Sequence, residues 1–527
     1  MIREKIKQIL KKALKDAREI KIEYPSDEKF GDYATNIAFV LAKAESKSPR
    51  EFAESLVSKI SGNKKTREIF EKAEAAGSGF INFTVSKNFL QNELKEYIAR
   101  PTPRMNIGRG KKLNIEFLSA NPTGKFQVGN GRGGFYGDVL GNVLKLAGYA
   151  VKKEYYINNA KSSNQIQELG KTALGAGDKY LTDYVLEKIE KIKPAICAGS
   201  SPAHIGEAGY LLAEEIHKDS RKFLEEKAGI HYDVWTEEQK LHEEGRLEEA
   251  LKILEKKGLI YEKEGAKWLR TTDFGDDKDK VIVRSNGEYG YFLADIAYHL
   301  DKKKRGFKVI IDVFGADHQG HVEPMKIAMN ILDYDGKFEV LVTQLVQAKG
   351  GGRFSKRAGN VIPLEELIDE VGADAARFFY LMKSIDTQIE FDFDLAKEQS
   401  EKNPVYYVQY AYARMNSILE NSKTKIQKPK FKGQNFNLLN HESELKLIKY
   451  LIRWSEVVED TAKDFEVHRI IGYATGLSSV FNGFYRDCRV ISDDKDLTIA
   501  RLGLVIAAKN VLKEVLESLG ISAPEYM

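Results

Sequence analysis

The chain has 527 residues, 42% hydrophobic and 30% charged, and its 82 Lys and Arg residues outnumber its 78 Asp and Glu residues by a net charge of +4. This length predicts three or four domains rather than one core. No run approaches the roughly 20 apolar residues that span a bilayer, so we expect no membrane partner. The two cysteines, Cys197 and Cys488, form no CxxC motif. They argue against a disulfide framework and favour a reducing, cytoplasmic location.

Residues 1–100 form the first predicted domain. The opening segment MIREKIKQILKKALKDAREI places apolar residues on one face of a charged helix and is not a secretory signal. A short strand near Ile20–Tyr24, two helices and a strand pair around Phe70–Val85 follow. The basic, Pro- and Gly-containing stretch 100–112 is typical of a linker.

Residues 113–134, LNIEFLSANPTGKFQVGNGRGG, predict a phosphate-binding site. An alternating strand leads into a turn and then into a glycine-dense segment that opens a helix. Glycines let a ligand approach the backbone, and the helix N-terminus attracts anions. We therefore expect a bound nucleotide at this point of the chain.

The spacing Gly129-x-Gly131-x-x-Gly134 also fits a dinucleotide fingerprint, with Glu154 placed as the ribose-binding acid. That fingerprint begins directly at the strand end, whereas here the segment SANPTGKFQV intervenes. The dehydrogenase interpretation is therefore the weaker of the two.

The region from 110 to about 400 has an α/β pattern. Strands are predicted at 113–118, 149–156, 307–314 and 340–345, and the last two have the apolar character of strands buried on both faces of a parallel sheet. Residues of about 165–265 are mostly helical and interrupt this sheet as an insertion. A hairpin is predicted from Val281–Arg284 and Tyr289–Phe292 around Asn286-Gly287.

Two further segments of this region carry candidate chemistry. Phe314-Gly315-Ala316-Asp317-His318 follows a buried strand, where a turn lines the ligand crevice of a parallel sheet. His318 and His321 have no third ligand type nearby, so we do not expect a metal. Residues 349–360, KGGGRFSKRAGN, form a basic loop with a glycine hinge, which is either a simple solvated loop or a mobile cation source for departing phosphates.

From 401 to 527 no strand pattern is present. Amphipathic helices are predicted at 403–421, 443–463, 468–486 and 497–519, and a lysine-rich connector joins the first two. These lysines are a solvated loop or, in a chain that binds nucleic acid, contacts to phosphate.

Together these segments resemble the arginyl-tRNA synthetases of class I. Glu116, Ser119-x-Asn121-Pro-Thr-Gly, Gln127-Val-Gly-Asn130 and Arg132-Gly resemble the family's HIGH region, and Arg353-Phe-Ser-Lys356-Arg resembles its KMSKS loop. Tyr291–His299 resembles its arginine-recognition helix, 30–36 (FGDYATN) the signature of its tRNA-corner-binding add-on domain, and 403–411 the start of its anticodon-binding domain. Gln127 departs from the family histidine and Arg353 from its lysine.

The resemblance implies a multidomain α/β fold: an N-terminal α/β add-on domain (1–100), a class I Rossmann-like catalytic domain (110–400) with a helical insertion, and a C-terminal all-α helical bundle (401–527). It also implies a role for each matched residue. We expect Glu116 and Asp295 to hold the guanidinium of arginine from two sides, with Tyr291 on its plane, because a carboxylate accepts its paired donors two at a time. The remaining arginine-binding residues are Ser119, Asn121 and Gln319; the ATP-binding residues are Thr123, Gly129, Gly131, Arg132, Gly315, Asp317 and Ser355; and the catalytic residues are Gln127, Asn130, Arg353 and Lys356.

The implied activity is that of an arginine–tRNA ligase using ATP with Mg²⁺. Arginyl-adenylate would form first and then esterify the terminal adenosine of tRNA(Arg), in a monomer whose first step requires bound tRNA. The alternative is a catalytically silent paralogue that binds tRNA or arginine, to which the departures at Gln127 and Arg353 point. Glutamine keeps an amide donor and arginine keeps the charge, so the active enzyme is the preferred interpretation.

Overall fold

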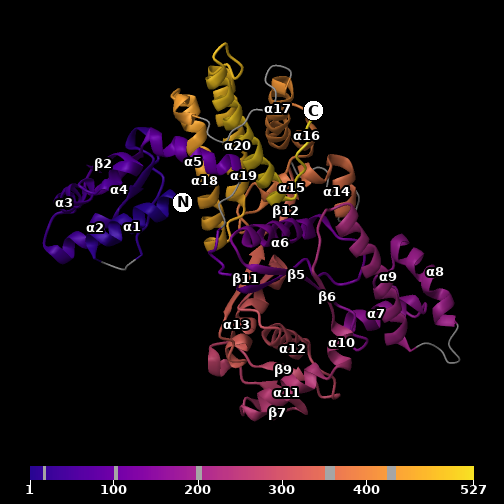
Figure 1. Cartoon of the computed structure of the whole chain (residues 1–527). Coiled ribbons are helices and arrows are strands. Elements are labelled where there is room, and N and C mark those ends of the chain that lie inside the picture. The colour runs from indigo at the N-terminus through magenta and orange to yellow at the C-terminus, as the bar shows by residue number, and fades with distance from the viewer. Residues whose placement is uncertain (16–18, 100–104, 198–203, 350–361, 424–434) are drawn as a thin grey trace.

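The computed structural model describes residues 1–15, 19–99, 105–197, 204–349, 362–423 and 435–527. A bundle of long helices lies above the central parallel sheet, the N-terminal unit lies beside the bundle, and the helices α7 to α9 of the insertion lie on the opposite side (Figure 1). No helix in the described part of the chain is both long and apolar enough to span a membrane.

The N-terminal unit is a small antiparallel sheet, of order β1-β3-β2, covered by helices. The expected strand near Ile20–Tyr24 is only a single bridge between Glu23 and Ala34. The helix α3 begins at a capping box formed by Ser48 and Glu51, as its sequence favours. The elements are α1 (Ile2–Leu14), β1 (Tyr33–Thr35), α2 (Ile37–Leu41), α3 (Pro49–Ser61), α4 (Lys64–Ile69), β2 (Phe70–Ala76), β3 (Phe80–Val85) and α5 (Lys87–Ala99).

Residues of the FGDYATN signature contact the C-terminal bundle at two positions and are exposed at another. Asp32 accepts a hydrogen bond from the amide of Val85 at 2.8 Å and pairs with Lys449, and the hydroxyl of Tyr33 donates to the buried carboxylate of Glu456 at 3.1 Å. Lys449 and Glu456 belong to α18 (Glu442–Asp464), a helix of the C-terminal bundle. These two signature residues therefore dock the N-terminal unit onto the bundle, whereas Phe30 is exposed.

The central sheet has five parallel strands in the order β11-β10-β4-β5-β6. The strand β10 is buried on both faces along most of its length, as the apolar run 307–314 predicts. The same prediction for 340–345 is wrong, because β11 is an edge strand and is only partly buried. Glu116, Asp312 and Glu154 lie directly opposite one another on three neighbouring strands, because β4 pairs Glu116 with Asp312 of β10 and with Glu154 of β5. The strands are β4 (Lys112–Phe117), β5 (Ala150–Ile157), β6 (Val234–Glu237), β10 (Val309–Gly315) and β11 (Lys337–Thr343).

The helix α6 (Val128–Leu146) follows β4 and packs tightly on it. A Cβ at Gly137 would lie 2.3 Å from the ring of Phe117, so only glycine allows this approach. The region ends with β12 (Val346–Ala348), α14 (Leu364–Val371), α15 (Ala373–Leu381), β13 (Ile389–Phe391) and α16 (Phe393–Lys397).

The insertion between β5 and β10 contains strands as well as the helices that the sequence predicted. The strand β6 lies inside the range expected to be helical and extends the main sheet. The second arm of the predicted hairpin is one bridge, Val283–Tyr289, because Gly290 already caps the next helix. The elements are α7 (Asn164–Ala173), α8 (Asp183–Cys197), α9 (Ile205–Glu226), α10 (Glu238–Glu243), α11 (Arg246–Lys256), the antiparallel β7 (Ile260–Lys263), β8 (Ala266–Leu269) and β9 (Lys280–Val283), then α12 (Tyr291–Lys304) and, after β10, α13 (Val322–Ile331).

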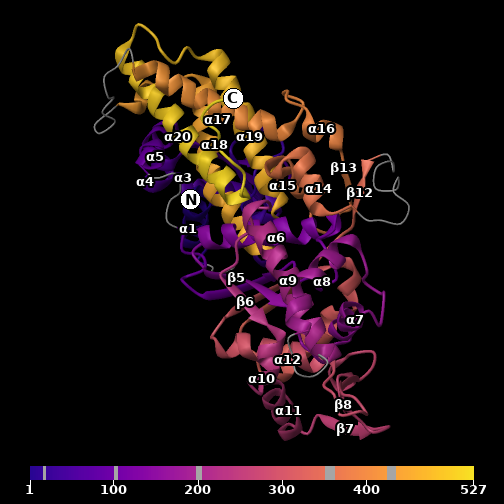
Figure 2. The same cartoon turned by 90° about the vertical axis from the view of Figure 1, so that its right-hand side faces the viewer.

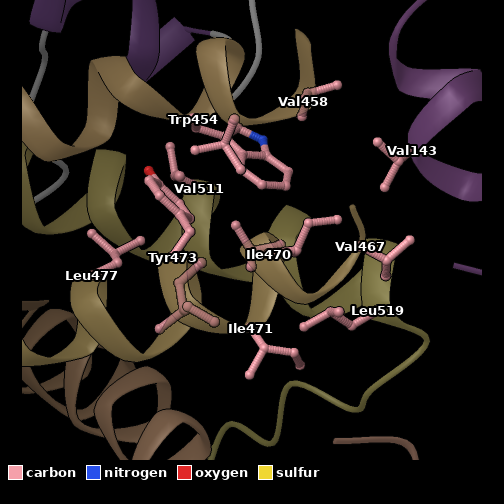
Figure 3. Packing of buried hydrophobic residues seen from close by; sticks show 14 of the residues in the cluster. Val143, Trp454, Val458, Val467, Ile470, Ile471, Tyr473, Leu477, Val511 and Leu519 are labelled. Carbon is pink, nitrogen blue, oxygen red and sulfur yellow. The ribbon is translucent and has the colours of Figure 1, made fainter. Parts of the chain in front are cut away.

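Four long helices form the C-terminal bundle, close to the predicted ranges: α17 (Pro404–Lys423), α18, α19 (His468–Asp487) and α20 (Lys495–Leu519). Figure 2 shows the bundle above the sheet from the side. Trp454, Tyr473 and Leu477 lie in its core, and Val143 of α6 faces the same cluster (Figure 3).

Polar contacts also join α6 to this bundle. The hydroxyl of Tyr136 donates to the carbonyl of Phe465 at 2.6 Å, and the amide of Asn142 donates to that of Ser518 at 3.1 Å. The buried guanidinium of Arg377 binds Asp138 of α6 at 2.7 Å and the carbonyl of Leu519 at 3.2 Å. These hydrogen bonds attach α6, the helix that begins at the glycine loop, to the C-terminal ends of α18 and α20.

Candidate active site

A cavity of about 520 Å³ opens at the carboxyl ends of β4 and β10, beside the first turn of α6. This is the edge of a parallel sheet at which ligands bind. The residues predicted from the sequence that line it are Glu116, Ser119, Asn121, Thr123, Gln127, Gly129, Asn130, Tyr291, Asp295, Gly315 and Asp317.

The first turn of α6 forms one wall of the cavity. The side chain of Asn130 caps the helix by accepting from the amide of Gln127 at 2.7 Å. Gly129 is exposed, and a Cβ at this position would meet no atom within 4 Å, so the cavity reaches the helix backbone. Gln127 donates to the carbonyl of Lys125 at 3.1 Å, which leaves its second amide hydrogen for a ligand.

Two poorly neutralised carboxylates face the cavity from opposite elements. Asp295 of α12 has no hydrogen-bond or ion-pair partner for its carboxylate among the described residues, and burial, reinforced by Glu116 and Asp312, raises its pKa to about 6. Glu238, the first residue of α10, is 6% exposed. Burial and then the charge of Asp295 raise its pKa to about 7. A cation placed between Asp295 and Glu238 would favour the charged form of both carboxylates.

Glu116 is less free than the sequence suggested. One of its oxygens already accepts from the ammonium of Lys302 at 2.7 Å, so this oxygen is partly committed within the protein. The same ammonium binds Asp312 at 2.9 Å, and His299 binds the other oxygen of Asp312 at 2.7 Å. Burial alone would raise the pKa of Asp312, but Lys302 and His299 together lower it below its ordinary value.

Tyr291 and Ser119 line the cavity but already make contacts within the protein. The ring of Tyr291 is 41% exposed at the first position of α12, and its hydroxyl accepts from the amide of Asn164 at 3.0 Å. The hydroxyl of Ser119 accepts from the amide of Tyr156 at 3.0 Å. Both contacts connect the cavity wall to the chain that leaves β5.

Three predicted ligands do not line the cavity. Arg132 is buried, and its guanidinium donates to backbone carbonyls at the end of α15 and just after it, at Tyr380, Ser384 and Thr387, so it is a structural residue rather than an ATP ligand. A Cβ at Gly131 would meet Leu364 at 2.9 Å, so this glycine serves helix packing. Gln319 is exposed in the turn Ala316–His321 but does not border the cavity, unlike its neighbours Asp317, His318 and His321.

Arg353, Ser355 and Lys356 lie outside the described residues, as does the lysine-rich connector. The described residue that follows the basic loop is Ile362, which is hydrogen-bonded to the start of α6. Its carbonyl accepts from the amide of Val128 at 3.1 Å, and Leu364 donates to the carbonyl of Phe126 at 2.8 Å. The chain leaving the basic loop is therefore paired with the segment that begins α6.

The sequence did not reveal several residues of the cavity. Glu238 lies in the charged stretch TEEQKLHEEG, which resembles a solvated helix face. His217 of α9 is buried in the wall with no hydrogen-bond partner for either ring nitrogen in the described structure, and burial lowers its pKa to about 4. Within the described ranges, no group of three or more His, Cys, Asp or Glu side chains could hold a metal ion.

The parallel sheet, the cavity at its edge and the attached helical bundle define a class I aminoacyl-tRNA synthetase. Residues 215–390 match the family description "tRNA synthetases class I (R), catalytic domain", residues 1–85 match "Arginyl tRNA synthetase N terminal domain", and residues 408–527 match "DALR anticodon binding domain".

The chain belongs to the arginyl-tRNA synthetase family. It is 42% identical over 536 residues to the arginine–tRNA ligase of Geobacter sp. (strain M21), covering 96% of this chain and 95% of that one. It is 41% identical to that of Caldanaerobacter subterraneus subsp. tengcongensis, covering 100% and 99%. The arginyl-tRNA synthetase of Thermus thermophilus, 21% identical, shares the fold with a TM-score of 0.79 over 100% of both chains. These relatives confirm the predicted family, fold class and activity, that of an arginine–tRNA ligase.

Proposed function

We propose that the cavity binds arginine between Asp295 and Glu238 and joins it to ATP. The support is the pair of poorly neutralised carboxylates, which a guanidinium neutralises with paired donors on a plane. Glu116 contributes its one unbonded oxygen, and the exposed ring of Tyr291 covers the guanidinium plane. Asn121 and Ser119, on the loop after β4, hold the amino and carboxylate ends of the substrate.

The nucleotide lies on the other side of the cavity. The first turn of α6, with Gly129 and the side chains of Gln127 and Asn130, receives the phosphates, because a helix N-terminus attracts anions. Thr123, Gly315 and Asp317 contact the rest of ATP. Arg353, Ser355 and Lys356 neutralise the departing pyrophosphate, and Mg²⁺ arrives with ATP as part of the substrate.

The reaction has two steps. A carboxylate oxygen of arginine attacks the α-phosphorus of ATP, the bond to the bridging oxygen breaks, and pyrophosphate leaves. The terminal 2′-hydroxyl of tRNA(Arg) then attacks the carbonyl carbon of the adenylate, and AMP leaves. The protein contributes mainly positioning and charge neutralisation.

The tRNA is proposed to lie across the bundle and the N-terminal unit. Exposed Phe39 and Phe80 lie edge to face on the N-terminal unit with ring centroids 5.3 Å apart, and such rings suit stacking on unpaired bases. We also propose that the chain works as a monomer in the cytoplasm, where its partner tRNA serves protein synthesis.

Exchange of labelled pyrophosphate into ATP tests this proposal. Exchange should require arginine, be strongest with tRNA(Arg) present, and stay near background with lysine. A protein that binds tRNA(Arg) but exchanges no pyrophosphate under these conditions is a silent paralogue, and the proposed roles of the cavity would then be wrong.

A further inference from the structure

Three acids form a row at the cavity wall, where Glu116 and Asp312 border the cavity and Glu154 does not. Asp312, Glu116 and Glu154 occupy opposed positions on the parallel strands β10, β4 and β5. Their exposed fractions are 0%, 8% and 0%, so water solvates none of the three carboxylates well. Such a row is costly to bury unless positive groups lie against it.

The helix α12 supplies those positive groups from one face. His299 binds Asp312 at 2.7 Å, Lys302 binds both Asp312 and Glu116, and Arg305, which follows the helix, binds both oxygens of Glu154 at 2.8 Å. The three bases are spaced at intervals of three residues, which places them on one side of a helix. Asp295 begins this same face one turn earlier and points into the cavity.

Lys302 is the central member of this set. It is fully buried, its ammonium bridges two strands, and it lies 4.2 Å from the ring centroid of Tyr298, another cavity residue. It does not border the cavity itself. Because it occupies one oxygen of Glu116, the orientation of the other oxygen toward the cavity depends on Lys302.

We infer that Lys302 is a positioning residue of the arginine pocket, which fixes Glu116 under the substrate and places a positive charge between the buried carboxylates Glu116 and Asp312. This inference rests on the proposed function of the cavity. Lys302 does not contact arginine in this arrangement, because the groups that contact arginine lie between it and the substrate. Its loss should nevertheless weaken arginine binding, which the loss of a purely structural ion pair would not do.

Charged and titratable groups face Lys302 from several elements of the fold, Tyr334 after α13 among them. Burial alone would lower the pKa of Lys302, but Asp312, Glu116 and Glu154 outweigh it, so the pKa is raised and the ammonium stays charged. Lys302 in turn lowers the pKa of Asp295, against burial, Glu116 and Asp312. The other titratable and charged groups are Asp295, Tyr298, His299 and Arg305 from α12 and its end, Glu116 from β4, Glu154 from β5, Asp312 from β10, and Glu238 from α10.

The test compares Lys302→Met with Lys304→Met, which removes an exposed ammonium two residues further along the same helix. Pyrophosphate exchange with tRNA present gives KM for arginine between pH 6 and 9 and KM for ATP at pH 7.5. Lys302→Met should raise the arginine KM at least about tenfold and move the part of its pH dependence that Asp295 contributes to higher pH, since the loss of a neighbouring cation raises a carboxyl pKa. The ATP KM and both constants of Lys304→Met should stay within about twofold of the parent.

Lys302→Met leaves Glu116 without this ion pair and Asp312 with His299 alone, so Lys302→Met/Asp312→Asn, which restores the charge balance, is measured beside it. In the double variant the pH profile should return toward the parent, while the arginine KM stays high because Glu116 is no longer held. A parental arginine KM and pH profile in Lys302→Met, or in the double variant where the single one does not fold, would overturn the inference. Absence of arginine-dependent exchange in the parent would instead overturn the proposed function.

Discussion

Lowering the pH should weaken arginine binding in two steps, because Glu238 and Asp295 must both be charged to hold the guanidinium. Their pKa values, about 7 and about 6, are raised by burial, so protons compete with arginine for the empty pocket. Binding is therefore complete above both values and is lost as the pH falls through 7 and then 6.

The size of the effect follows from these values. At pH 6 Glu238 is ionised in about one molecule in eleven and Asp295 in about half, so roughly one pocket in twenty carries both charges. KM for arginine at pH 6 should therefore be about twentyfold its value at pH 8.5.

Initial rates of pyrophosphate exchange at saturating ATP, across pH 6 to 8.5, measure this KM. Glu238→Gln should raise the arginine KM by about tenfold or more at pH 8.5 and remove the step near pH 7, since one charged acceptor is lost. Glu237→Gln is the matched control, because Glu237 pairs with Lys240 and does not line the cavity. An arginine KM that stays constant between pH 8.5 and 6 would refute the assignment of these carboxylates to the guanidinium.

Three further outcomes are expected. Asp295→Asn should lower kcat/KM for arginine by about 2–4 kcal/mol of transition-state binding, and an unchanged value would remove Asp295 from the pocket. Lys356→Ala should lower kcat by roughly 10²–10³ with little change in arginine binding, as loss of one preorganised donor does; parental charging of tRNA would place the catalytic cation elsewhere. Gln127→His should be neutral or improve the rate a few-fold, by about 1 kcal/mol, whereas Gln127→Ala should be clearly slower. Recovery of an inert parent by Gln127→His would favour the silent paralogue.

Elements with a long regular pattern were predictable. The apolar alternation of 113–117 and the helical periodicity of the C-terminal bundle depend on local sequence, and both are present in the structure. The strand β6 was not predictable, because Val234–Glu237 is four residues long and is recognisable only through its pairing with β5. The missing hairpin arm has a similar cause, since the cap at Gly290 starts a helix where a strand was expected.

The site was predictable where a motif is contiguous and not where the chain folds back. The loop after β4 and the start of α12 each contain predicted residues that line the cavity. Glu238 arrives from an insertion, and Lys302 is paired with two strands distant in sequence, so neither has a local signal. The family resemblance implies an ATP-binding role for Arg132, but the carbonyls that it binds come from residues about 250 positions later, which no local motif reveals.

The attachment of α6 to the helical bundle limits which fragments of the protein can fold alone. A fragment ending near residue 400 would lack the bundle carbonyls that accept hydrogen bonds from the catalytic region. The donors are Tyr136, Asn142 and Arg377, and their acceptors are Phe465, Ser518 and Leu519 in that order. It would also expose Val143, which faces the bundle core (Figure 3). Buried donors without acceptors and an uncovered apolar helix face both disfavour a folded state. The catalytic region is therefore not a transplantable module: expressed alone it should aggregate, and in the full chain it should melt in one transition with the bundle.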